Sequence, residues 1–146
     1  MLELESALER ILAIVPPPTS ESVKLTAASG RVLTENIASP LDLPPFDNSA
    51  MDGYAVRAHD VAGATAANPV RLRLHGRLAA GENSPNSIQS GECARIFTGA
   101  PIPGGADTVV MQEDTRVEGD EVLILDAVRS GENVRWHGED VRKGSL

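Results

Sequence analysis

The chain has 146 residues with a formal net charge of −8, and 41% of its residues are hydrophobic. Such a chain buries roughly 68–70% of its unfolded surface, which is enough for one hydrophobic core. The negative charge and the 3% aromatic content argue against nucleic acid or an anionic membrane as the main partner. No apolar run approaches the roughly 20 residues of a membrane span, and the single Cys93 cannot form an internal disulfide, so we expect a cytoplasmic protein.

The N-terminal segment has the spacing of an amphipathic helix. Between residues 2 and 15, apolar side chains recur three and four positions apart, at Leu4, Ala7, Leu8, Ile11, Leu12 and Val15. This spacing places them on one helix face. Three consecutive prolines at 16–18 end the helix, because proline lacks the backbone donor that the next turn would need.

Short elements are predicted next. Residues 23–31 fit a short helix closed by a glycine at position 30, and residues 32–38 fit a short strand. A further strand begins at residues 54–57, after a proline-rich loop. Residues 60–68, which are rich in Ala and Gly, are expected to form a loop or a brief helix.

The second half of the chain has the pattern of a β protein. Residues 70–75 alternate with a period of two, which places Arg71, Arg73 and His75 on the polar face of a half-buried strand. Short strands, many turns and one substantial helix predict a mainly-β fold of the α+β type, with irregular mixed β-sheets and hairpins. The further strands are predicted at 93–97, 107–112 and 121–125, with a polar, turn-rich segment at 81–91 and a hairpin at 118–120.

The loop LPPFDNSAMDGYAVR at residues 43–57 is the strongest candidate for a functional site. Its prolines exclude a regular helix, and the Asp52-Gly53 step suits a turn at positive φ that presents the carboxylate outward. An ordinary loop would not carry large apolar side chains, because their exposure is costly. The polar members of the loop are Asp47, Asn48, Ser49, Asp52 and Tyr54, and its large apolar or aromatic members are Phe46, Met51 and Tyr54.

Two interpretations of Asp52 are open from spacing alone. A carboxylate held by a loop can act as a base, a metal ligand or a positioning group. An Asp-Gly turn can also use its carboxylate only to cap its own backbone, and this structural interpretation is the more common one. Asp47, Asn48 and Tyr54 are interpreted as side chains that support the loop, and Ser49 as a member of the same hydrogen-bonding shell.

Two other segments carry polar groups after short strands. Thr98-Gly99 can offer a hydroxyl and backbone N–H groups to an anion, although such a pair also commonly ends a strand. Arg135 offers a fork-shaped donor that suits the oxygens of a phosphate or of another oxyanion. Glu139 and Asp140 would point to opposite faces of an extended segment, so at most one of them would join Asp52. A solvated, charged strand edge is the competing interpretation of this third segment.

These segments together resemble a known family. PPFDNSAMDGYAVR at 44–57, RIFTGAPIP at 95–103 running into ADTVVMQE at 106–113, and NVRWHGEDV at 133–141 are similar to motifs of the molybdopterin molybdenumtransferases and of the related domain of gephyrin-type proteins. The resemblance covers nearly the whole chain but only the N-terminal part of such an enzyme. With the turn and apolar residue at 143–146, it predicts a truncated chain that ends before the molybdopterin-binding α/β domain.

The resemblance implies a transferase reaction. The enzyme inserts molybdenum from molybdate into adenylylated molybdopterin and releases AMP, with the help of a divalent cation, expected to be Mg²⁺. It further implies a homodimer that meets a molybdopterin adenylyltransferase-type partner in the pathway. Residues 1–45 and 136–146 would belong to an elongated arm or dimerisation region and 46–135 to a compact mainly-β domain, and we expect the fragment alone to be inactive.

Residue roles follow from the same resemblance. Asp52 is expected to be catalytic, in molybdate insertion and adenylate hydrolysis. Asp52 and Asp140 are also the candidate metal ligands. The expected substrate-binding residues are Ser49, Met51, Thr98, Gly99, Arg135 and Asp140.

The rival hypothesis is a non-catalytic β-rich module that binds an oligosaccharide, a peptide or another protein. A nucleic-acid-binding barrel is its weakest form, because 3% aromatic residues and a net charge of −8 provide neither stacking platforms nor a basic groove. An assay of adenylate-dependent molybdate insertion by the full-length protein would separate the two hypotheses.

Overall fold

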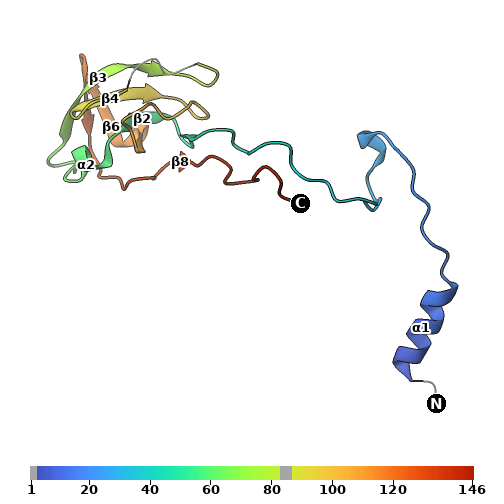
Figure 1. The fold of residues 1–146 in the computed structure, drawn as a ribbon. Helices are drawn as coiled ribbons and strands as arrows, with labels where there is room; N and C mark the ends of the chain where they lie inside the picture. Colours follow the sequence, from blue (N-terminus) through green and yellow to red (C-terminus); the bar gives the residue numbers. More distant parts are fainter. Residues whose placement is uncertain (1–2, 83–86) are drawn as a thin grey trace. The chain divides into compact units, whose positions relative to one another are not determined.

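The computed structural model describes residues 3–82 and 87–146. These residues divide into two compact units, one at 1–37 and the other at 38–146 (Figure 1). The mainly-β fold with one N-terminal helix is confirmed. None of the helices in the described ranges has the length and apolarity that crossing a membrane requires.

Unit 1 contains the helix α1 (Leu4–Ile14) and one turn of 3₁₀ helix, η1 (Leu25–Ala27). The helix predicted at 2–15 is confirmed, and its C-cap is Val15, directly before the prolines. Neither element of unit 1 contains a buried residue. The large apolar side chains of α1 are exposed, Leu8 by 53% and Ile11 by 57%.

Two predictions for unit 1 are wrong. The helix expected at 23–31 is reduced to η1, although Gly30 does adopt positive φ (+77°) as a helix-ending residue would. Residues 32–38 form no strand, and Val32 is 90% exposed. A helix of one turn does not repay its nucleation cost unless tertiary contacts stabilise it, and a strand needs a paired neighbour. Neither segment contains a buried residue.

Unit 2 is built on a mixed β-sheet of six strands in the order β5-β2-β4-β3-β7-β6. All neighbouring pairs are antiparallel except β3–β4, which is parallel. The register of β3 against β4 shifts between Leu74 and Arg77, around Gly76 at positive φ. The strands are β2 (Gly53–Val56), β3 (Val70–Leu78), β4 (Glu92–Ile96), β5 (Thr108–Met111), β6 (Thr115–Glu118) and β7 (Glu121–Ile124).

Unit 2 also contains a small second sheet. It pairs β1 (Asn48–Ser49) with β8 (Val134–Arg135), which sequence analysis did not predict as strands because each has two residues. A bridge between Leu43 and Val141 extends the pairing towards the C-terminus. The peptide bond between Leu43 and Pro44 is cis. The remaining elements are the helix α2 (Ala58–Val61), which starts two residues before the predicted loop, and the 3₁₀ turn η2 (Gln112–Asp114).

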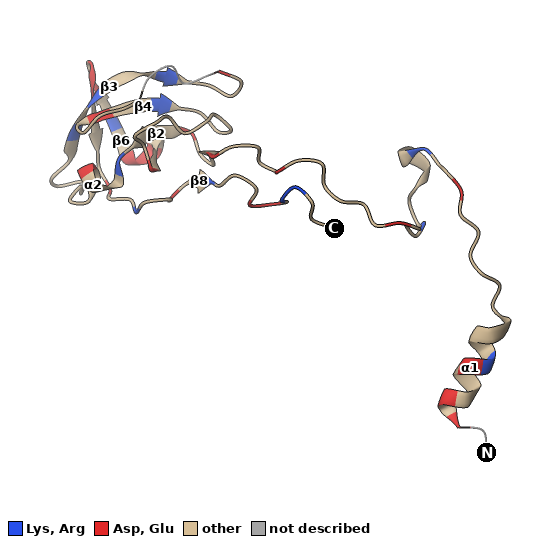
Figure 2. Cartoon of the chain, viewed as in Figure 1, with Lys and Arg blue, Asp and Glu red and all other residues tan. Residues whose placement is uncertain are grey.

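The core lies on both faces of the six-stranded sheet. One buried cluster contains Tyr54, Val56 and Val110, and the other contains Ala55, Ile96 and Val109. Successive residues of β2 therefore enter opposite clusters, as side chains of a strand buried on both faces do. Polar residues line the strand faces that remain exposed, and both Arg and acidic side chains lie on the strands of the sheet (Figure 2).

Candidate functional site

Asp52 and Thr98, which are 46 positions apart, meet at the end of the sheet. The turn between β1 and β2 carries Asp52, and the turn after β4 carries Thr98. The backbone N–H and the hydroxyl of Thr98 both donate to Asp52 Oδ1, with distances of 2.8 and 2.7 Å. Both residues are exposed. Asp52 Oδ2 accepts no hydrogen bond from the described residues, so half of the carboxylate is available to a ligand.

The contact fixes the charge of Asp52. The backbone N–H of Thr98 lowers the pKa of the Asp52 carboxyl below its ordinary value of 3.8, and the Thr98 hydroxyl and the positive charge of Arg95 act in the same direction. Hydrogen bonds to a carboxylate stabilise its ionised form. Asp52 is therefore an anion at neutral pH, displayed to solvent with one oxygen oriented by Thr98.

Asp52 does not cap its own turn. Its carboxylate binds a residue of a different loop, so the local-capping interpretation is wrong. The expected positive φ at Gly53 is also wrong, since this glycine is not among the residues with positive φ. Glycine is needed there for space, because a Cβ at position 53 would lie 2.0 Å from the carbonyl oxygen of Val110 on the neighbouring strand β5.

The three segments singled out in the sequence lie next to one another. Ser49 N–H donates to the Ala100 carbonyl at 3.0 Å, and Gly99 N–H donates to the Ser49 carbonyl at 2.8 Å, which joins the first segment to the second. Ser49 also pairs with Val134 in the small sheet, and Ala50 N–H donates to the carbonyl of Asn133 at 2.9 Å. The backbone of the Asp52 loop is thus held from both sides.

The predicted substrate-binding residues of this loop differ in access. Ser49 is fully buried, and its hydroxyl donates to the Met51 carbonyl at 2.5 Å, so it shapes the turn. Met51 is 39% exposed. Gly99 adopts positive φ (+81°), which lets the chain turn between Thr98 and the buried Ala100.

The residues predicted to support the loop make specific contacts. Asp47 accepts the backbone N–H of His137 at 2.7 Å, and this bond ties the first segment to the third. The side-chain amide of Asn48 donates to the Phe46 carbonyl at 3.1 Å. Tyr54 is buried in the core of unit 2.

Arg135 is engaged within its own segment. Its guanidinium pairs with Glu139 at 2.8 Å and with Asp140, so both carboxylates reach the same cation. They do so because residues 137–140 form a turn and a bend rather than an extended segment, which makes the expectation of opposite faces wrong. Glu139 also accepts the N–H of Trp136 at 2.8 Å, and the Arg135 guanidinium lowers the pKa of Glu139. The pairing favours the interpretation of a charged strand edge, on which the Arg135 side chain is partly exposed.

Metal ligation has limited support from side chains alone. The described residues contain no group of three or more His, Cys, Asp or Glu side chains placed to hold a metal ion. Asp52 contacts Thr98, whereas Asp140 contacts Arg135. Cys93 is fully buried, and burial raises the pKa of its thiol to about 12, so it is a packing residue.

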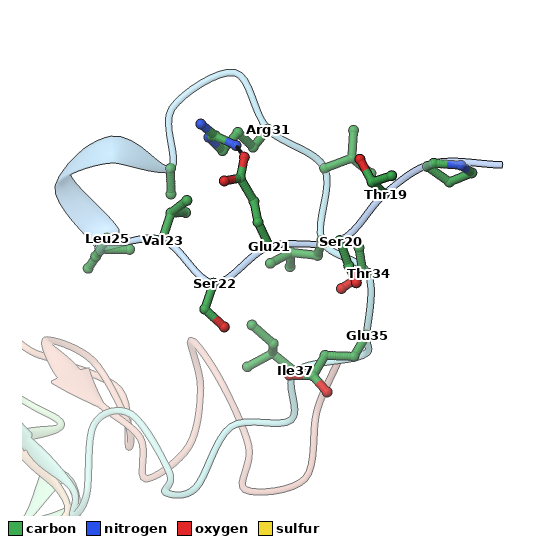
Figure 3. A pocket seen from close by; sticks show the side chains of 14 residues that line it. Thr19, Ser20, Glu21, Ser22, Val23, Leu25, Arg31, Thr34, Glu35 and Ile37 are labelled. Atoms are coloured by element: carbon green, nitrogen blue, oxygen red, sulfur yellow. Dashed lines mark hydrogen bonds and ion pairs between the residues drawn. The ribbon is translucent and has the colours of Figure 1, made fainter. Parts of the chain in front are cut away.

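Unit 1 contains a hollow that none of the predicted site residues lines. Its wall consists of residues from 18 to 37, and an ion pair between Arg31 and Glu21 crosses one side (Figure 3). Leu25 and Val32 in this wall are exposed by 91% and 90%. A hollow with such an open wall does not have the enclosed apolar lining of a ligand pocket.

Sequence analysis missed two residues next to the site, Arg95 and Gln112. Arg95 donates to the carbonyl of Gly53 and to the Gln112 side chain, and Gln112 N–H donates to the Asp52 carbonyl at 3.1 Å. A signal was present, since Arg95 and Phe97 are two positions apart in a predicted strand and so share a face directly before Thr98.

The chain matches one family model, that of the "MoeA N-terminal region (domain I and II)", over residues 2–146. It is similar to a molybdopterin molybdenumtransferase of a Nostoc species, with 51% identity over 80% of this chain and 27% of that protein. It is 41% identical to the molybdopterin molybdenumtransferase of Synechococcus elongatus over 99% of this chain and 37% of that protein. The chain therefore spans about a third of the length of these relatives.

A solved structure has the same fold. The crystal structure of the "molybdopterin biosynthesis moeA protein" from Pyrococcus horikoshii superposes with a TM-score of 0.80 at 42% identity. The match covers 86% of this chain and 33% of that protein.

Proposed function

We propose, from the premise that this chain belongs to the MoeA N-terminal region family, that it is the N-terminal part of a molybdenum-inserting transferase. The complete enzyme takes molybdenum from molybdate, inserts it into adenylylated molybdopterin and releases AMP. The names of relatives that are 41–51% identical support this proposal. The chain supplies one part of the active site, and because it corresponds to about a third of those relatives, it is inactive alone.

The observation that carries the proposal is the Asp52–Thr98 contact. It joins the two motifs that most strongly resemble the family, and it presents an ionised carboxylate with one oxygen available. A carboxylate in this state can accept a proton or orient a bound water. We assign Asp52 the catalytic role and Thr98 the role of fixing its orientation.

A divalent cation, proposed as Mg²⁺, fits this arrangement with a restricted ligand set. Mg²⁺ is commonly held by one or two carboxylates while it keeps several waters and binds substrate phosphates. The available Oδ2 of Asp52 can serve as such a ligand. Asp140 fits less well, because Arg135 already neutralises it. When bound, the cation would offset the negative charge of the adenylate.

The remaining assignments are part of the proposal. Met51 and Gly99 adjoin the exposed carboxylate and would contact substrate, whereas Ser49 would act through the turn that it shapes. Arg135 would reach a substrate oxyanion only by exchanging one of its carboxylate partners. We also propose a homodimer in the cytoplasm, in which another part of the enzyme completes the cleft, and a molybdopterin adenylyltransferase-type enzyme that supplies the substrate.

The proposal is tested by Asp52→Asn in the full-length enzyme. This substitution keeps the shape and removes the charge, so stability should change by less than about 1 kcal/mol. Molybdenum insertion should fall at least about tenfold, which corresponds to roughly 1.4 kcal/mol of transition-state stabilisation. Asp126→Asn is the matched control, since Asp126 is exposed and contacts only the adjacent Ala127 N–H among the described residues.

Full activity of a folded Asp52→Asn enzyme would contradict the catalytic role. Absence of adenylate-dependent insertion by the unmodified enzyme would instead favour the non-catalytic module.

A further inference from the structure

Arg95 lies next to the two segments that carry Asp52 and Thr98. It is on β4, two residues before Phe97 and three before Thr98. Its guanidinium lies over the ring of Tyr54 at 5.1 Å and over the ring of Phe97 at 5.0 Å. Tyr54 lies on β2, two residues after Asp52, so the same cation contacts one aromatic ring from the strand that follows the Asp52 turn and one from the segment that leads into Thr98.

Hydrogen bonds extend this contact to the backbone of Asp52. Arg95 Nη1 donates to the Gly53 carbonyl at 3.4 Å, and Nη2 donates to Gln112 Oε1 at 2.5 Å. Gln112 in turn donates its backbone N–H to the Asp52 carbonyl at 3.1 Å. One guanidinium therefore binds both the Gly53 carbonyl and the Gln112 side chain, and Gln112 in turn binds the Asp52 carbonyl.

An exposed carboxylate is held in place only if contacts fix the backbone around it. Asp52 is not enclosed by packed side chains, so the backbone on either side must define where its oxygens lie. Arginine suits this task because its planar fork can bind two acceptors while its face stacks on an aromatic ring. A lysine ammonium in the same place would keep the charge but lose this geometry.

We propose that Arg95 is a positioning residue that locks the Asp52 loop against the Thr98 turn. Its consequence for molybdenum insertion rests on the proposed function, whereas its effect on the Asp52–Thr98 contact does not. The positive charge of Arg95, which helps to lower the pKa of Asp52, supports the assignment.

The test compares Arg95→Lys with Arg77→Lys in the 146-residue chain by NMR. Arg77 also lies over the Phe97 ring, at 5.9 Å, but makes no hydrogen bond to residues 52–54 within the described part of the chain. Arg95→Lys should raise the pH midpoint at which the Thr98 amide signal titrates with the Asp52 carboxyl. It should also accelerate hydrogen exchange at Thr98 and Gln112 by about tenfold, the factor expected for one lost charge-assisted hydrogen bond.

Arg77→Lys should leave both signals as they are in the unmodified chain, and the amides of β5 should keep their protection in both variants. An unchanged Thr98 midpoint and unchanged exchange in Arg95→Lys would overturn the proposal. If Arg95→Lys does not fold, Gln112→Met decides, because it removes the Oε1 acceptor from an exposed side chain. Acceleration at the same two amides supports the proposal, and no change overturns it.

An activity measurement separates this inference from the proposed function. In the full-length enzyme, Arg95→Lys should lower kcat for molybdenum insertion by about tenfold and change KM for molybdate by less than about threefold. Should Asp52→Asn retain activity, the proposed function fails, while the NMR result still decides whether Arg95 positions the loop.

Discussion

The two units use their apolar residues in opposite ways. Unit 2 buries its apolar side chains in two clusters on either face of a sheet, with Val56, Ile96 and Ile124 completely shielded. Unit 1 leaves them exposed, including Leu4 by 77% and Ile14 by 82%. Chains below about 40 residues rarely build a sufficient core alone, and unit 1 spans residues 1–37. The difference indicates that unit 2 folds on its own residues, whereas the apolar face of α1 needs a surface supplied by something else.

The largest effect is expected where unit 2 is packed most closely. Gly53→Ala would place a Cβ 2.0 Å from the Val110 carbonyl oxygen and force β2 away from β5. We expect about 3 kcal/mol of destabilisation, at the upper end of overpacking effects. Denaturant unfolding measures it, with Gly63→Ala as the control, since a Cβ at position 63 meets nothing within 4 Å.

Equal stability of Gly53→Ala and Gly63→Ala would contradict the close approach of β2 to β5.

A substitution in the apolar face of α1 tests whether this exposed face binds another surface. We predict that the chain self-associates through this face, so Leu8→Glu should shift it towards monomer in sedimentation. Burying one leucine contributes about 1.5–3 kcal/mol, and the dissociation constant should rise at least about tenfold. Ala13→Glu adds the same charge on the opposite face of the helix and serves as the control.

A chain that sediments as a monomer at every concentration, with α1 protected from hydrogen exchange, would show that the helix is covered within its own chain. Neither variant should change the unfolding of unit 2.

The pH dependence of stability tests whether the Asp52 carboxylate is charged when it contacts Thr98. Its pKa is below 3.8 in the folded chain, chiefly because of the Thr98 N–H. The stabilisation from this contact is therefore fully present above the unfolded-state pKa and is lost as the pH falls below about 4 through the lowered pKa. The difference in unfolding free energy between the unmodified chain and Asp52→Asn should shrink over that acidic range. A difference that is constant from neutral pH into acid would contradict the charged contact.

The smallest effect is expected for Arg135→Lys. Its ion pairs with Glu139 and Asp140 are partly exposed, so the change in stability should be about 0–1 kcal/mol. Arg116→Lys, in the exposed hairpin pair with Glu118, is the control. In the full-length enzyme Arg135→Lys should also weaken substrate binding if the guanidinium holds an oxyanion. Unchanged affinity with a larger loss of stability would assign Arg135 a purely structural role.

Elements that follow from a regular spacing of apolar residues were predicted well. The 3.6-residue periodicity predicted α1, and the alternation at 70–75 predicted β3, which extends three residues further to Leu78. The strand at 32–38 was wrong because a β-favourable composition does not supply a pairing partner. The two-residue strands β1 and β8 could not be predicted, because only the pairing across the chain defines them.

The candidate site was predictable in composition but not in its contacts. The motifs marked Asp52 and Thr98, yet nothing local shows that both donors of Thr98 would go to one oxygen of Asp52. The role of Gly53 was attributed to its dihedral freedom, whereas a neighbouring strand determines it. Whether the arm proposed at 1–45 and 136–146 forms stays a prediction.

The position of β6 at the outer edge of the sheet bears on how copies of the chain can associate. An edge strand exposes a row of unpaired N–H and C=O groups to which another strand can add, the first step of many aggregates. Here the strand has four residues, and Arg116 and Glu118 project from it as an ion pair. A second strand would have to displace these hydrated charges. Strand addition is therefore disfavoured at the β6 edge, and the self-association predicted for this chain would use the apolar face of α1 and not this edge.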